Sequence, residues 1–456
     1  MVLLVRWFLA SASFVAIHAY LQEFTGSTTT DLPVPTFNVE DIPNGNYGSG
    51  DEFNEMDLFG DDIILNEEQR RAIWERKAYI IPSSRWPEGS DGNPLVPYRY
   101  LGLPSGHISA IQAGINSWME HTCIKFEETT NTNQSHIIFI LGSGCSSYIG
   151  MQSSNGQYIS IGNGCQFVGT VVHEIFHALG CFHEQSSTNR DDYVNVHYEN
   201  IISTKIYNFN KHSTAIVSNY GLPYDLSSVM HYGSKYFTWN GKLTITTNDP
   251  LHQGIIGQRS GLSFYDKLLA NRMYNCTDKW LTACGFNSDP CNNDGYIGSN
   301  CKCVCRPGTT GNYCETIIGG YYDGLLSPCT EVVTQPGIIT SPNFPDPYPK
   351  NEKCTKIIRA PDCYLPMLKF NFFHLYPMTY SCNQACCYVD ILEIRVNGQE
   401  YGDVYCDKDI SPGDTFVSVT NEIILYFQTK SNLLNGWSAT VSFIPIPGCL
   451  PSYCTS

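Results

Sequence analysis

The pattern of apolar and polar residues predicts helices and strands in the middle of the chain and strands alone near its end. Five apolar residues between Ser105 and His121 share one helical face: Ile108, Ile111, Ile115, Trp118 and Met119. Ser105 is placed to cap this helix. We expect the apolar face to pack into a core.

Short apolar or alternating runs predict four strands before residue 165: Val96–Tyr100, Cys123–Phe126, His136–Leu141 and Gln157–Ile161. Residues Phe167 to Val172 then form an apolar run compatible with a helix, and a further helix is expected at Phe264–Tyr274. After residue 319, apolar runs at 367–372, 389–396 and 422–427 are separated by turn residues, which is typical of an all-β domain.

The run HEIFHALGCFHE, which begins at His173, carries the clearest chemical signal. On a helix His177 lies on the same face as His173, so both can reach one metal ion. Glu174 would lie beside the metal, where a general base for a bound water belongs. Gly180 can end the helix in a left-handed conformation and let His183 return as a third ligand. Three histidines and one open position are typical of catalytic zinc.

The pattern H-E-x-x-H-x-x-G-x-x-H resembles the metzincin zinc peptidases, and Glu184 with the later run SVMHY (228–232) resembles the astacin family in particular. The resemblance implies an α+β catalytic domain that holds one Zn²⁺. Met230 would be the Met-turn residue under the metal, and Tyr232 a displaceable zinc ligand that stabilises the transition state. Glu184 would pair with the new amino terminus after activation. The Gln157–Ile161 strand would be the edge that binds extended substrate.

A propeptide is expected at residues 20–77, because this segment is polar and acidic and has no cysteine. Its residues Phe59 to Ile63 resemble the F-x-G-D-I motif of astacin propeptides, in which an aspartate occupies the zinc. Counting from Phe59 and Ile63 gives Asp62, and counting from the Gly-Asp pair gives Asp61; we favour Asp62.

Dibasic pairs place the end of the propeptide after Lys77 or, alternatively, after Arg71. A Trp-Pro pair at residues 86–87 resembles the start of astacin catalytic domains and favours Lys77. The catalytic domain is then expected at 78–277.

Composition points to a secreted protein. The chain of 456 residues has 20 cysteines, none before Cys123, which suits an oxidising compartment. Residues 1–19 resemble a signal peptide, and no later stretch is apolar enough to serve as a membrane anchor. A net charge of −16 argues against nucleic acid as a partner.

The astacin resemblance implies two disulfides in the catalytic domain, Cys123–Cys276 and Cys145–Cys165. Cys181 is left over and is expected to be buried and free. Asn133 and Asn275 begin glycosylation sequons.

Residues 278–318 contain six cysteines among many Gly and Asn residues and resemble an EGF-like module. The expected pairing is first to third, second to fourth and fifth to sixth, of which Cys305–Cys314 is the firmest. A zinc cluster is the alternative.

Residues 319–444 resemble a CUB domain, an all-β sandwich, for which Cys329–Cys354 and Cys387–Cys406 would be the disulfides. Cys363, Cys382 and Cys386 are extra, and their pairing stays open. Of the carboxylates that bind calcium in many CUB domains, only Asp390 is matched, so we expect no calcium here. In the tail, residues 445–456, Cys449 and Cys454 are expected to pair.

The sequence therefore predicts a multidomain secreted zinc endopeptidase, made as a zymogen, that acts on extracellular protein or peptide substrates. One alternative is a catalytically inactive matrix-binding protein built on the EGF-like and CUB modules. Another is a structural protein in which zinc serves only folding. The presence of Glu174 and all three histidines argues against the first alternative, and the open zinc position argues against the second.

Overall fold

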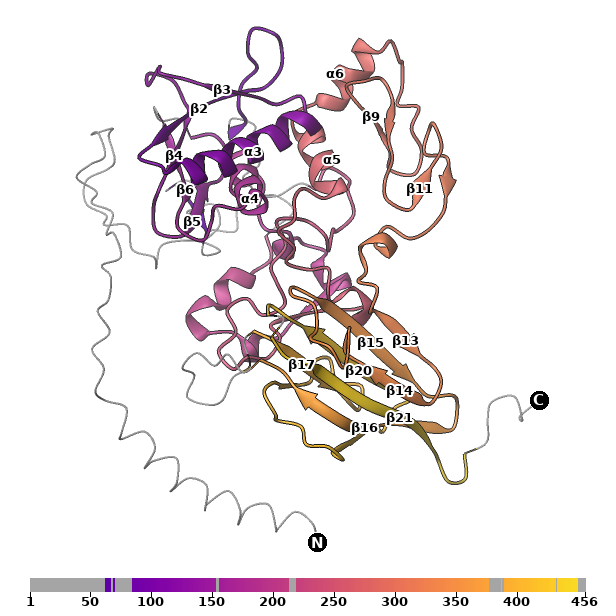
Figure 1. Ribbon diagram of the computed structural model, residues 1–456. Helices are drawn as coiled ribbons and strands as arrows, with labels where there is room; N and C mark the ends of the chain where they lie inside the picture. Colours follow the sequence, from indigo (N-terminus) through magenta and orange to yellow (C-terminus); the bar gives the residue numbers. More distant parts are fainter. Residues whose placement is uncertain are drawn as a thin grey trace, which may run out of the picture. The chain divides into compact units, whose positions relative to one another are not determined.

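The computed structural model describes residues 62–66, 69, 84–152, 156–212, 219–376, 387, 389–431 and 433–449 (Figure 1). These residues all fall in one unit of the chain, Ser49–Ser456. The expected signal peptide, most of the expected propeptide including Asp61, Cys382, Cys386 and Cys454 lie outside the described residues.

A six-stranded sheet in the order β1-β5-β6-β4-β2-β3 forms the scaffold of the first domain. Its strands are β1 Ile63–Ile64, β2 Leu95–Leu101, β3 Lys125–Glu128, β4 Ile137–Ile140, β5 Cys145–Tyr148 and β6 Gln157–Ile161. Only β5 and β6 run antiparallel to each other. The expectation that residues 157–161 form an edge strand is wrong. The chain folds back at β5 and covers the free side of β6, and β1 then pairs in parallel with β5.

Two helices, α3 (Ser105–His121) and α4 (Val168–Ala178), pack against each other beside this sheet (Figure 1). Gly114 permits the close approach, because a Cβ there would lie 2.5 Å from Val171 Cγ1. The rings of Trp118 and Phe176 lie 4.8 Å apart, between the same helices. The expected Ser105 cap is wrong: the cap residue is Pro104, whose extended backbone precedes the helix without a side-chain hydrogen bond.

The second half of the first domain consists mostly of short elements. They are η4 Glu184–Ser186, η5 Arg190–Asp192, β7 Val194–Val196, η6 Tyr198–Asn200, η7 Ser203–Phe209, β8 Ile245–Thr247, η8 Pro250–His252, α5 Phe264–Met273 and α6 Cys276–Ala283. A reciprocal capping box starts α5, in which the side chains of Ser263 and Asp266 each accept the other's backbone N–H. The Cys123–Cys276 disulfide ties the start of α6 to the residues that follow α3. The Cys145–Cys165 disulfide joins β5 to the loop before α4.

The cysteine-rich segment contains two small antiparallel ribbons, one of β9 (Tyr296–Ile297) with β10 (Cys303–Val304) and one of β11 (Thr309–Thr310) with β12 (Thr316–Ile317). Its disulfides are Cys284–Cys301, Cys291–Cys303 and Cys305–Cys314. All six cysteines are therefore joined in pairs, an arrangement that leaves no thiolate here for a zinc cluster.

The last domain consists of two sheets, ordered β13-β15-β20-β17-β18 and β14-β21-β16-β19. The element that precedes them is η9 Asp323–Leu325, and the strands are β13 Glu331–Val333, β14 Gly337–Thr340, β15 Lys353–Arg359, β16 Tyr364–His374, β17 Ile391–Arg395, β18 Asp403–Tyr405, β19 Thr415–Val417, β20 Glu422–Gln428 and β21 Gly436–Pro445. A core of buried apolar residues, with Phe370 and Trp437 among the largest, lies in this domain. This is the expected all-β sandwich.

The cystines of the last domain are Cys329–Cys354, Cys387–Cys406 and Cys363–Cys449. The expected pairing of Cys449 with Cys454 is therefore wrong. The register of β16 on β21 sets Tyr364 opposite Pro445, and Ile446 N donates to Cys363 O at 2.8 Å. The paired strands therefore bring Cys449 next to Cys363, which lies directly before β16.

Asp390, the single residue that matched a calcium site, is fully buried in this domain. Its carboxylate accepts hydrogen bonds from the Tyr348 hydroxyl at 2.7 Å, from the Lys430 amide at 2.6 Å and from the Ser431 amide at 3.0 Å. The Ser431 hydroxyl donates to it as well. Protein donors therefore occupy this carboxylate.

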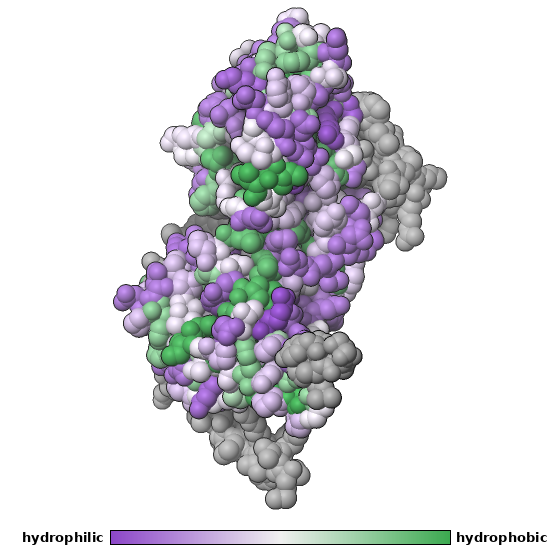
Figure 2. Space-filling view, turned by 90° about the vertical axis from the view of Figure 1, so that its right-hand side faces the viewer, coloured by the Kyte–Doolittle hydropathy of each residue, from purple (hydrophilic) through white to green (hydrophobic). Residues whose placement is uncertain are grey.

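The visible face in Figure 2 is mainly hydrophilic, with apolar patches separated by polar residues. Exposed large apolar side chains occur on several elements, for example Phe167 before α4, Trp239 before β8 and Ile318 after β12. Among the described residues, no helix combines the length and the apolar character that crossing a membrane requires.

Candidate active site

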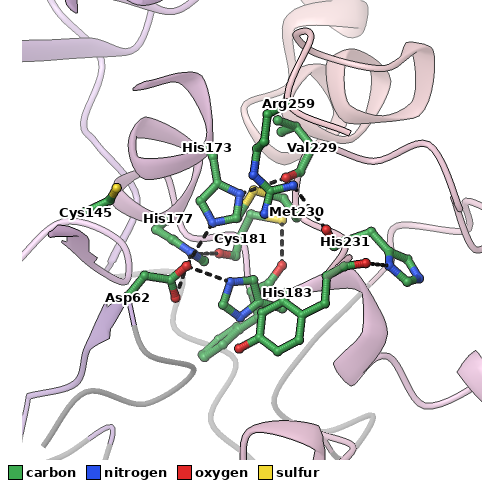
Figure 3. A network of polar contacts seen from close by, with 12 residues as sticks. Asp62, Cys145, His173, His177, Cys181, His183, Val229, Met230, His231 and Arg259 are labelled. Carbon is green, nitrogen blue, oxygen red and sulfur yellow. Dashed lines mark hydrogen bonds and ion pairs between the residues drawn. The ribbon is translucent and has the colours of Figure 1, made fainter. Parts of the chain in front are cut away.

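Helix α4 and the turn after it gather three histidines. His173 and His177 lie one turn apart on α4, with ring centroids separated by 4.7 Å. Gly180 adopts a φ of +108°, which side chains disfavour, and the chain turns back there. The ring of His183 thereby comes within 4.8 Å of that of His177, measured between centroids. The spacing in the sequence thus places three imidazoles around one point (Figure 3).

Two backbone carbonyls fix how two of these rings are oriented. The Val229 carbonyl lies 2.8 Å from His173 Nδ1, and the Cys181 carbonyl lies 2.7 Å from His177 Nδ1. A carbonyl only accepts hydrogen bonds, so each Nδ1 carries the proton and each Nε2 of a neutral ring carries a lone pair. Both lone pairs are therefore available to a ligand, an arrangement common for metal-bound histidines.

Asp62 points into the space between the three rings (Figure 3). Its Oδ2 lies 3.2 Å from Nε2 of His173 and 3.2 Å from Nε2 of His183, and its Oδ1 lies 3.8 Å from Nε2 of His177. These atoms form a four-residue group in which one atom from each residue lies within 4.8 Å of the others.

The electrostatics of this group suit a bound cation. Burial lowers the pKa of His173 to about 3 and also lowers the pKa of His183, so both rings stay neutral. Burial by itself would raise the pKa of Asp62, but its contacts with His183 and the two other imidazoles hold that pKa well below its usual range. An anionic carboxylate therefore faces the Nε2 lone pairs of His173 and His177. The buried atoms His177 Nε2 and Asp62 Oδ1 have no hydrogen-bond partner.

Zinc fits this set of atoms. Lone pairs that face one another without a proton repel each other, and a divalent cation between them would turn the repulsion into coordination. Three imidazole nitrogens and one carboxylate oxygen are ligands that Zn²⁺ takes, whereas Ca²⁺ and Mg²⁺ prefer oxygen ligands alone. His173, His177, His183 and Asp62 would hold the ion.

Glu174 lies beside this group and is 1% exposed. Its Oε2 is buried without a hydrogen-bond partner. Burial, followed by the negative charge of Asp62, raises its pKa well above the usual range, and Arg259 opposes the shift. A carboxyl group with a raised pKa next to a metal site is suited to exchanging protons with water.

The three residues assigned by the resemblance also lie at the site. Met230 is fully buried, and its carbonyl accepts from Glu184 N at 3.1 Å. The ring of Tyr232 packs on that of His183, with centroids 4.6 Å apart. Glu184 Oε1 accepts from Asp225 N at 2.9 Å, and burial raises the pKa of Glu184 to about 8. Within the described part of the chain, Glu184 forms no ion pair with a basic side chain.

Sequence reasoning missed the groups that hold the histidines in place. Asp266, in the first turn of α5, accepts from Ser228 Oγ at 2.6 Å and from Val229 N at 2.9 Å. The S-x-x-D pattern that starts at Ser263 predicts a helix cap, but nothing in it indicates a contact with residues 228–229. The carbonyls of Cys181 and Val229 leave no mark in the sequence, because every residue has one.

The two asparagines of the sequons are both exposed. Asn133 lies in the loop before β4, and Asn275 lies in the turn between α5 and α6 with a φ of +57°. Cys181 is the one free cysteine of the described residues and is partly buried.

Comparisons with known proteins agree with this geometry. A family model described as Astacin (Peptidase family M12A) matches residues 81–275, and a model described as CUB domain matches residues 329–441. Blastula protease 10 of Paracentrotus lividus is 35% identical over 409 residues, which are 85% of this chain and 65% of the relative. This chain thus spans less than two thirds of that relative's length.

Two further proteins show the same likeness. Zinc metalloproteinase dpy-31 of Caenorhabditis elegans is 30% identical over 414 residues, which are 86% of this chain and 67% of the relative. The solved structure of high choriolytic enzyme 1, a hatching enzyme zinc-protease from Oryzias latipes, is 36% identical, with a TM-score of 0.41; the match covers 44% of this chain and all of that one. The chain belongs to the astacin family of peptidases, family M12A, and carries a CUB domain.

Proposed function

We propose that this protein is a zinc-dependent endopeptidase that is made as a zymogen and secreted. The observation that carries the proposal is the convergence of three imidazoles on the Asp62 carboxylate, two of which hold their proton on Nδ1 and so turn an Nε2 lone pair towards it. A metal ion accounts for this arrangement. A propeptide carboxylate on that metal would account for latency.

The residues of the site divide the chemistry among them. When bound, zinc supplies Lewis acidity, which lowers the pKa of a water and polarises a peptide carbonyl. The Glu174 carboxylate accepts the proton of the attacking water and passes it to the nitrogen of the leaving amine. The Tyr232 hydroxyl donates a hydrogen bond to the oxygen that becomes negative in the transition state. The Val229 and Cys181 carbonyls keep His173 and His177 oriented.

The segment around Asp62 blocks substrate in two ways. The carboxylate occupies the position that a scissile carbonyl needs, and β1 pairs with β5, which would be the outer strand of the sheet without β1. Ser147 N donates to Asp62 O at 2.8 Å, and the Gln69 side chain donates to Ile149 O at 2.9 Å. Removal of residues 20–77 would therefore free both the metal and an edge strand for the backbone of an extended substrate.

Removal of the propeptide would also provide a positively charged partner for Glu184. Cleavage after Lys77, or after Arg71 as the alternative, creates a new α-amino group that can move to the buried Glu184 carboxylate. A positive charge there would lower the pKa of Glu184 again and stabilise the mature enzyme.

The remaining segments are those of an extracellular protein. Residues 1–19 would direct secretion, and the disulfides require an oxidising compartment. The EGF-like module at 278–318 and the CUB domain at 319–444 would dock extracellular protein or peptide substrates, and Asn133 and Asn275 would carry glycans.

One experiment separates this proposal from an inactive matrix-binding protein. The processed wild type and Glu174→Gln are purified, their zinc content is measured, and cleavage of casein is compared. We expect one zinc per chain in both proteins and cleavage by the wild type alone. Equal inertness of both proteins with the propeptide removed would overturn the proposal and favour a binding role.

A further inference from the structure

Two adjacent tyrosines, Tyr321 and Tyr322, pack against the peptidase domain although they lie outside it in sequence. They follow β12 of the cysteine-rich segment and precede residues 329–441, the stretch that the CUB family model matches. Tyr321 is 7% exposed, and its ring lies 4.8 Å from that of Tyr265 on α5. The ring of Tyr322 lies 4.8 Å from that of His252 in η8. The pair therefore joins two apolar clusters, one within the peptidase domain and one that also includes Tyr296 of β9.

The hydroxyl of Tyr322 bridges two backbone groups of one loop. It accepts from Leu226 N at 3.0 Å and donates to Tyr224 O at 3.4 Å. The residue between them is Asp225, whose backbone N–H donates a hydrogen bond to Glu184 Oε1. One phenol thus holds the loop on both sides of the contact with Glu184.

The hydroxyl of Tyr321 binds the next residue of the same loop. Ser227 Oγ donates to Asp225 Oδ1 at 2.6 Å, so its proton is already used. The Tyr321 hydroxyl, 3.1 Å from Ser227 Oγ, must therefore be the donor in that contact. Burial, followed by the charge of Asp225, raises the pKa of Tyr321 and that of Tyr322, so both phenols keep their protons.

The loop leads directly to a zinc ligand. Ser228 Oγ and Val229 N both donate to Asp266, and the Val229 carbonyl accepts from His173 Nδ1 at 2.8 Å. A displacement of residues 224–227 would therefore pass along the backbone to the carbonyl that orients His173. Packing alone would not require the two hydroxyls, since phenylalanine fills the same space.

We infer that Tyr321 and Tyr322 are positioning residues for the active site, supplied from outside the peptidase domain. They hold residues 224–227 so that the Val229 carbonyl keeps the His173 ring in place. The cysteine-rich segment and the linker behind it would thus be needed for full activity, in addition to any role in docking substrates.

The test is the double variant Tyr321→Phe/Tyr322→Phe in the processed full-length protein, which keeps the rings and removes both hydroxyls. Tyr313→Phe is the matched control, because Tyr313 belongs to the same segment and is 52% exposed. We expect kcat to fall about tenfold with KM unchanged, as for other groups that orient metal ligands. The control should match the wild type.

A second measurement does not depend on activity, since the inference rests on the proposed zinc site. Release of zinc to a chelating dye is followed in the Glu174→Gln background, with and without the two phenylalanines. We expect release about tenfold faster in the variant without hydroxyls. The inference would be wrong if the double variant and the Tyr313→Phe control had equal kcat and equal rates of zinc release. The two tyrosines would then contribute packing alone, even if the melting temperatures of the two proteins differed.

The activity assay and the zinc-release assay separate a failure of the proposed function from a failure of this inference. If the wild type binds zinc but cleaves nothing, the proposed function fails while zinc release still decides the inference. If the double variant does not fold, the single variants Tyr321→Phe and Tyr322→Phe replace it. The Tyr322 variant is then expected to show the larger effect, because it leaves the Leu226 amide without an acceptor.

Discussion

In the proposed zymogen, replacing Asp62 with alanine should release peptidase activity without proteolysis. The Asp62 carboxylate faces all three histidines, while the backbone around it stays anchored through Ser147 and through the pairing of β1 with β5. The substitution therefore removes the group that would occupy the metal and leaves the rest of the segment in place. Asp62→Asn should give an intermediate result, because an amide oxygen has the same shape but no charge.

The size of the effect follows from the contacts of the carboxylate. A hydrogen bond to a charged group contributes about 1.5–3 kcal/mol, and we assign the same value to each close contact of the carboxylate. Two of the contacts of Asp62 lie at 3.2 Å, so the loss is at least about 3 kcal/mol. Since about 1.4 kcal/mol corresponds to a factor of ten, the open form should become about 100-fold more populated.

The assay is peptide hydrolysis by an unprocessed chain in which both dibasic pairs, residues 70–71 and 76–77, are replaced with alanine. Asp61→Ala is the matched control, and it also decides between the two aspartates that the sequence motif leaves open. Activity should rise about 100-fold with Asp62→Ala and stay at the latent level with Asp61→Ala. Equal activity of the two variants, or release by Asp61→Ala alone, would refute the reasoning.

Three further predictions concern the propeptide, the long disulfide and the buried carboxylates. Ile63 is fully buried against Leu65 and Ile149, so Ile63→Ala should cost about 2 kcal/mol, at the low end for a core site. A peptide of residues 58–69 that carries this change should inhibit the mature enzyme about 30-fold more weakly than the parent peptide; equal inhibition would show that Ile63 does not anchor the segment. Removal of the Cys123–Cys276 disulfide, by serine at both positions, should cost about 2–5 kcal/mol in urea unfolding, and an unchanged midpoint would contradict this. Burial, followed by the charge of Asp266, raises the pKa of Asp225 to about 7, so the folded protein keeps a proton that the unfolded chain releases above about pH 4. The free energy of unfolding of the wild type should therefore fall as the pH rises from about 4 to 7. Over the same interval, the Asp225→Asn variant should become more stable relative to the wild type. A stability difference that does not change with pH in thermal unfolding would show that Asp225 is ionised in the folded state.

The sequence determined those features that depend on local spacing. Helical periodicity placed His173 and His177 on one face, and Gly180 allowed the turn that brings in His183, so the grouping of the three histidines could be predicted without coordinates. The same holds for helix α3 and strand β6, whose bounds match the predicted ranges, and for the separation into an α+β domain and an all-β CUB domain. Each of these features is set by residues a few positions apart.

Tertiary structure decided what depends on contacts between distant residues. Sequence reasoning placed the edge strand at 157–161, but only the pairing of strands shows that β5 covers β6 and receives β1. It expected Cys449 to pair with its neighbour Cys454, whereas the register of β16 on β21 brings Cys363 to it. The groups that orient the histidines, namely the carbonyls of Val229 and Cys181 and the carboxylate of Asp266, are specified by position in space. A backbone carbonyl or a common acidic residue has no sequence pattern of its own, so only the folded chain assigns it a role.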